Sequence, residues 1–120
     1  MRKLAAGALM LVALGACTRS ISVALPSQSV TVMAYADGKV VERCGFRPGS
    51  DKFQKLNQLL QQNSGGWRKR HSNYQPEFLV VDGDVSLYFM SDSVVINYSA
   101  GEFSRGLSPD AYHFLDCKVR

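Results

Sequence analysis

The sequence predicts an α+β domain, in which a small antiparallel sheet packs against one amphipathic helix. Two observations predict this class. Short runs of β-branched and aromatic residues alternate with Asp-Gly and Ser-Asp turns, and apolar residues recur at helical spacing in one segment near the middle of the chain. We expect an N-terminal hairpin, the helix, a three-stranded meander and a short C-terminal helix, in that order.

The hairpin is predicted between residues 30 and 44. Asp37-Gly38 separates its two runs, and this dipeptide favours a two-residue turn because both turn positions need a positive φ. Such a turn sets Tyr35 opposite Val40 and Ala34 opposite Val41. Neither face of the hairpin is cleanly apolar, so the pattern leaves the choice of buried face open.

The helix is expected to begin after Ser50, a favourable N-cap, with Asp51 where the helix dipole favours an acid. It is expected to end at Asn63-Ser64-Gly65-Gly66. Its apolar stripe should pack against the sheet and consists of Phe53, Leu56, Leu59 and Leu60.

The meander is predicted as strands over 77–82, 84–90 and 93–99, with turns at Gly83 and at Ser91-Asp92. Residues 101–106 are expected to form a loop. Ser108-Pro109-Asp110 resembles an N-cap, a first-turn proline and an acid, so a short helix is expected around residues 111–115.

The N-terminus has the pattern of a secretory signal. Arg2 and Lys3 precede an apolar run over 4–14, which is too short for a membrane-spanning helix of roughly 20 residues. Leu14-Gly15-Ala16-Cys17 then resembles the lipobox of bacterial prolipoproteins. The resemblance implies a diacylglyceryl thioether on Cys17, cleavage before this residue and acylation of the new amino terminus.

Thr18, rather than an aspartate, follows the cysteine. In lipoproteins of this kind, that difference implies a protein on the periplasmic face of the outer membrane. We therefore divide the chain into a signal peptide (1–16), a lipidated tether (17–27) and a single small α+β domain (28–120).

Composition limits the partners of the mature chain. Loss of Arg2 and Lys3 leaves 12 of the 14 Lys and Arg against 10 Asp and Glu, so the net charge falls from +4 to +2. This small charge and the compartment argue against a nucleic-acid partner. With Cys17 lipidated, Cys44 and Cys117 remain, and an oxidising compartment favours a disulfide between them. Two free buried thiols are the alternative.

No pattern of residues spells out a reaction. The two histidines, His71 and His113, lack a metal-ligand spacing, and the chain has no nucleotide-binding or serine-hydrolase motif. A dispersed triad of a serine, His113 and Asp110 has no support. Asp82-Gly83-Asp84 is interpreted as a hairpin turn, since it lacks the further oxygen ligands of a calcium loop. We expect no catalytic residues, metal or cofactor.

One cluster is a candidate for binding: Trp67, Arg68, Lys69, Arg70 and His71, in a predicted loop after the helix. Three cations beside an aromatic residue suit an anionic partner, namely lipid phosphates, peptidoglycan carboxylates or an acidic protein face. The alternative is a solvated loop with Trp67 inserted into the core.

Two functions remain open. The first is a membrane-anchored, non-enzymatic binding module of the inhibitor or immunity type, which docks an envelope protein. The second is a structural envelope lipoprotein that links the membrane to the cell wall or to an assembly complex. An exposed functional cation cluster favours the first, whereas a broad exposed apolar patch favours the second.

Overall fold

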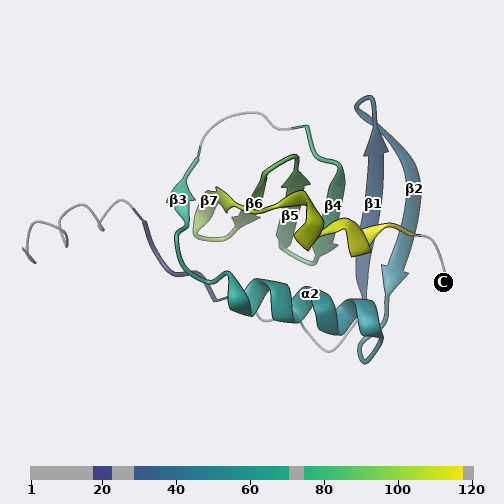
Figure 1. Ribbon diagram of the computed structural model, residues 1–120, viewed down its shortest axis with the longest axis horizontal. Helices are drawn as coiled ribbons and strands as arrows, with labels where there is room; N and C mark the ends of the chain where they lie inside the picture. The colour runs from purple at the N-terminus through teal and green to yellow at the C-terminus, as the bar shows by residue number, and fades with distance from the viewer. Residues whose placement is uncertain (1–17, 23–28, 71–74, 118–120) are drawn as a thin grey trace, which may run out of the picture.

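The computed structural model describes residues 18–22, 29–70 and 75–117 (Figure 1). In this part of the chain, seven antiparallel strands form one sheet in the order β2-β1-β4-β5-β6-β7-β3, and helix α2 covers one face. The α+β prediction is confirmed in outline, but the sheet is larger than expected. The predicted signal peptide and Cys17 lie outside the described residues.

The secondary-structure elements follow one another in the order of their labels, with α2 after β2. Their bounds are β1 (Val30–Ala36), β2 (Lys39–Phe46), α2 (Asp51–Gln62), β3 (Arg68–Lys69), β4 (Phe78–Asp82), β5 (Val85–Met90), β6 (Ser93–Tyr98), β7 (Gly101–Gly106), and the 3-10 turns η1 (Pro109–Ala111) and η2 (His113–Leu115).

The β1–β2 hairpin forms as predicted at its turn, where both residues have positive φ angles of 53° and 77°. Tyr35 pairs with Val40, but Ala34 pairs with Glu42 and not with Val41. A β-bulge inserts Val41 as an extra residue in β2, so the predicted register holds only beside the turn.

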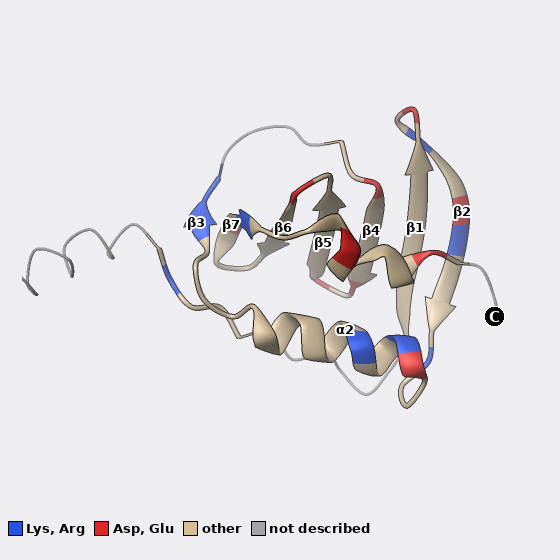
Figure 2. Cartoon of the chain, in the orientation of Figure 1, with Lys and Arg blue, Asp and Glu red and all other residues tan. Residues whose placement is uncertain are grey.

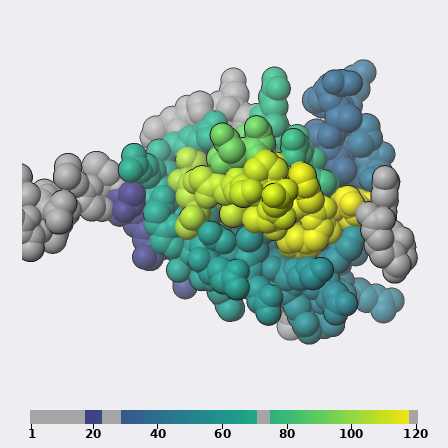
Figure 3. Space-filling view, viewed as in Figure 1, coloured from purple at the N-terminus to yellow at the C-terminus, as the bar shows by residue number. Residues whose placement is uncertain are grey.

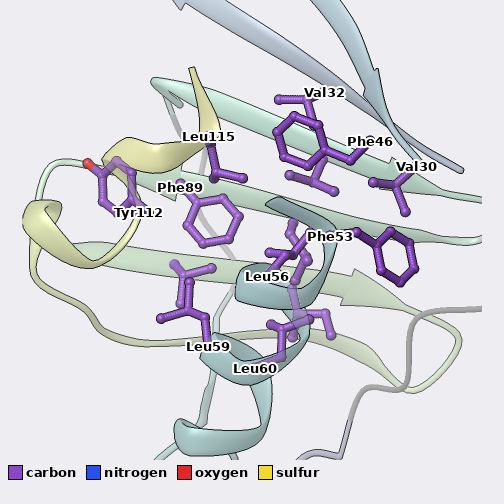
Figure 4. Packing of buried hydrophobic residues seen from close by; sticks show 14 of the residues in the cluster. Val30, Val32, Phe46, Phe53, Leu56, Leu59, Leu60, Phe89, Tyr112 and Leu115 are labelled. Carbon is purple, nitrogen blue, oxygen red and sulfur yellow. The ribbon is translucent and has the colours of Figure 1, made fainter. Parts of the chain in front are cut away.

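Helix α2 has the bounds and the buried stripe that the sequence predicts. The Ser50 hydroxyl oxygen accepts a hydrogen bond from the backbone N–H of Phe53 at 3.2 Å, which caps the first turn. All four residues of the apolar stripe are buried. This face packs against the sheet beside Phe89, Tyr112 and Leu115 (Figure 4).

The meander is longer than predicted. Residues 101–106, expected to be a loop, form β7, which pairs with β6 along its whole length. Glycines at both ends and a single apolar side chain, Phe103, concealed the strand in the sequence, although Phe103 is only 1% exposed. The predicted loop after α2 also contributes a short strand, β3, which pairs with β7.

The predicted short C-terminal helix is instead two successive 3-10 turns, η1 and η2. Ser108 caps the first, as expected, by accepting from the N–H of Asp110 at 3.3 Å. Tyr112 and Leu115 are both fully buried. Residues three apart align in a 3-10 turn, so this geometry directs both side chains into the core.

Candidate functional site

Trp67 does not belong to the molecular surface. Its side chain is 1% exposed, and its indole N–H donates to the carbonyl of Asn63 at 3.0 Å. A buried indole with a satisfied N–H contributes to the core and cannot contact an external partner. Trp67 therefore drops out of the predicted binding cluster and instead fixes the chain that leaves α2.

Arg68 and Lys69 are the exposed residues of this cluster. They form β3, the edge strand of the sheet, where Arg68 lies opposite Ser104 and Lys69 opposite Phe103. Neither side chain forms an ion pair with another residue in the part of the chain that the structure describes. Both charges are thus available to solvent or to a ligand.

A cation that the sequence analysis did not include, Arg19, joins them. Its backbone forms two hydrogen bonds with Trp67, with N···O distances of 2.8 and 3.1 Å, and its guanidinium carbon lies 4.6 Å from the centre of the Phe103 ring. The short segment 18–22 therefore extends the edge of the sheet. Its composition resembles a linker, and Ile21 was its one visible signal for packing.

Ile21 anchors this segment. Its side chain is 4% exposed in the hydrophobic core, and its N–H donates to the carbonyl of Ser64 at 2.7 Å. We predicted a tether over residues 17–27. Its described part, 18–22, lies against the domain, and residues 23–28 are outside the description.

Arg70 follows β3, and its N–H donates to the carbonyl of Glu102 at 3.0 Å. We call Arg19, Arg68, Lys69 and Arg70 the basic edge.

Arg105, on neighbouring β7, donates a hydrogen bond from its guanidinium to the carbonyl of Gly65 and thereby holds the loop after α2 in place. His71 lies outside the described residues. Figure 2 shows blue segments gathered at this end of the molecule.

The predicted disulfide between Cys44 and Cys117 is present, with the two Cα atoms 5.7 Å apart. It joins β2, the opposite edge strand, to the chain after η2. Lys52 adds a second tie, because its ammonium group donates to the backbone carbonyl of Asp116 at 2.6 Å. The bridge is a structural link, since oxidised sulfurs cannot act as nucleophiles.

The other polar side chains are dispersed. In ranges 18–22, 29–70 and 75–117, no three His, Cys, Asp or Glu residues gather as metal ligands would. A shallow groove of about 330 Å³ at the hairpin tip is lined by Tyr35, Asp37, Gly38, Gln75, Pro76 and Glu77. His113 is exposed beside the Tyr112 ring.

Comparisons with known proteins assign no relative: no protein-family model, curated protein or solved structure matches this chain. None of the helices in the described ranges is long and apolar enough to cross a membrane.

Proposed function

We propose that this chain is a lipid-anchored protein of the cell envelope, which acts as a non-enzymatic binding module for an envelope protein. The proposed lipid is on Cys17, and the proposed site is the periplasmic face of the outer membrane. Inhibition of an incoming toxin or hydrolase is one form that such binding takes.

One observation carries the proposal: the N-terminal segment and the β1–β2 hairpin occupy opposite ends of the sheet. Arg19 pairs beside β3, whereas β2 is the edge strand at the other end of the strand order. Six strand intervals of about 4.8 Å separate the two edges by up to roughly 29 Å. With the lipid anchor at the β3 end, the β2 edge is held away from the membrane. This arrangement suits a protein that binds a partner above the membrane surface.

The hairpin has features of a contact surface. It projects from the rest of the molecule (Figure 3), and its β2 strand bears Val40 and Val41, which are 43% and 58% exposed. These two are the large exposed hydrophobic residues among those described. The area of two valines is much smaller than several hundred Å². An exposed apolar patch of that size would favour the alternative, a structural envelope lipoprotein.

Affinity capture from the membrane fraction tests this function. Wild-type protein should incorporate a labelled fatty acid and capture an envelope protein, whereas Cys17→Ser should lose the label. Val40→Ser with Val41→Ser should weaken capture about five- to thirtyfold, since two apolar contacts contribute roughly 1–2 kcal/mol together.

A matched control is Lys55→Ser, an exposed change on α2 away from the hairpin. Unlabelled wild-type protein would contradict the anchor. Undiminished capture by the double valine variant would contradict the role of the hairpin.

A further inference from the structure

We propose that the basic edge rests on the anionic phosphates of the membrane in which Cys17 is anchored. The sheet then stands with β3 at the bilayer and β2 away from it. This inference rests on the proposed lipid anchor and adds a binding site in the folded domain itself, whose ligand is the phosphate of phospholipid headgroups.

The chain between the proposed lipid and the fold is short. Cys17 precedes Arg19 by two residues, and two residues span at most about 7 Å. Arg19 is fixed by its two backbone hydrogen bonds to Trp67, and Ile21 is buried two residues later. The lipid therefore emerges beside β3, and a freely rotating domain on a long tether is excluded.

This end of the molecule carries an excess of positive charge. Three segments meet here: 18–22, 63–70 and β7. Together they contain five Lys or Arg and one acid, Glu102, whose carboxylate accepts a hydrogen bond from the Asn97 amide at 3.2 Å. In contrast, blue and red segments alternate on the β1–β2 hairpin and at the start of α2 (Figure 2). Positive charge is concentrated where the lipid would emerge.

The cations of the basic edge point to both faces of the sheet. Successive residues of a strand point to opposite faces of the sheet. Phe103, opposite Lys69, is buried on the face that α2 covers, so Arg68 points to the other face. Arg19 lies on the same face as Lys69, because its guanidinium stacks on the Phe103 ring. A flat anionic surface that meets the edge contacts both sets of cations, whereas a peptide lying on one face would not.

Each cation of the basic edge is expected to strengthen membrane binding modestly, and the contributions of the cations add. A Lys or Arg near an anionic membrane surface contributes roughly a fivefold gain in partition. Removing two cations of the basic edge should therefore weaken partition at least about 25-fold, and reversing them should weaken it further. Lipidation raises the local concentration of the edge at the membrane, so a weak contact is sufficient to orient the domain.

Vesicle co-sedimentation tests the site without the lipid. The probe protein is the mature chain, 17–120, with Cys17→Ser. It should bind vesicles of phosphatidylcholine mixed with phosphatidylglycerol, fail to bind pure phosphatidylcholine, and dissociate as salt is raised. Arg68→Glu with Lys69→Glu should lose at least about 25-fold in partition.

The matched control replaces one lysine and one arginine on β2, the opposite edge strand: Lys39→Glu with Arg43→Glu. It changes the net charge by the same amount as the variant of the basic edge. This control should bind almost as well as the parent. Equal losses in the two variants would mean that net charge alone acts, and absent binding to the anionic vesicles would also overturn the proposal. Capture of an acidic protein by the basic edge without vesicle binding would assign the site to that protein instead. Fatty-acid labelling of wild-type Cys17 reports separately on the anchor.

Discussion

At the scale of single residues, Tyr112 connects the C-terminal turns to the sheet. Its side chain is fully buried against Phe89, with ring centres 5.4 Å apart, and its hydroxyl donates to Oε1 of Glu77 at 2.7 Å. Burial, followed by the hydrogen bond to this carboxylate, raises the pKa of the Tyr112 phenol above its ordinary value. The folded state thus holds the phenol proton more tightly than the unfolded state does.

Tyr112→Phe should lower the free energy of unfolding by about 1.5–3 kcal/mol, the contribution typical of a hydrogen bond to a charged group. Urea denaturation measures this loss. Tyr98→Phe, which removes a hydroxyl from a half-buried ring on β6, serves as the control and should change stability by less than about 1 kcal/mol. Equal stabilities of the wild-type and Tyr112→Phe proteins would contradict a stabilising role for the contact.

Ionisation of the Tyr112 phenol also makes the free energy of unfolding depend on pH, with a defined sign. Because the pKa of Tyr112 is raised on folding, its stabilisation is complete below the unfolded pKa of about 10 and is lost as pH rises above that value. The stability difference between wild type and Tyr112→Phe should therefore shrink in alkaline solution. A difference that grows with pH would contradict this assignment.

At the scale of elements, the sequence predicted those with a clear hydrophobic period and missed those without one. The four-residue stripe of α2 specifies both its type and its buried face. In β7, Phe103 alone is strongly apolar, and β3 is too short to show any period. These two strands form because neighbouring backbones pair with them, which is a tertiary effect that local pattern does not contain.

The disulfide is also an element-scale feature, since it ties the chain after η2 to β2 across 73 residues of sequence. Cys44→Ala or Cys117→Ala should lower the free energy of unfolding by about 2–5 kcal/mol, and the double variant should cost little more than either single change. Thermal or urea unfolding measures these values.

Hydrogen exchange would localise the effect. We expect the chain after η2 to exchange faster, whereas Tyr112 and Leu115 remain protected by burial in the core. Additive losses from the two single changes would show that the cysteines act independently of their bond.

At the scale of the whole molecule, the two ends of the sheet differ. The N-terminal segment and the cations of the basic edge lie at the β3 end, whereas the hairpin and the disulfide lie at the β2 end. The sequence predicted Arg68 and Lys69 as candidate contacts. It could not predict Arg19, because one apolar residue, Ile21, in a short polar stretch does not show which distant segment the chain packs against.

Ile21→Ala tests whether this packing holds the N-terminal segment in position. Loss of a buried isoleucine side chain should make local opening of the segment easier by about 2–5 kcal/mol. Amide exchange at Arg19 and Ile21 should accelerate more than exchange in β5 and β6. Ser22→Ala, an exposed change in the same segment, should have little effect. Unchanged exchange in Ile21→Ala would mean that the segment is held by other contacts.

In the proposed orientation, β3 faces the bilayer and β2 faces away from it. Spin labels on the lipidated protein in anionic vesicles test it most directly, one at Ala100→Cys in the exposed turn before β7 and one at Val41→Cys in β2. A lipid-soluble relaxing agent should act strongly on the label at 100 and weakly on the label at 41. The β6–β7 turn and β2 are four to five strand intervals apart, so the label at 41 lies up to roughly 24 Å further from the membrane. Equal relaxation at both positions, or stronger relaxation at 41, would contradict this orientation.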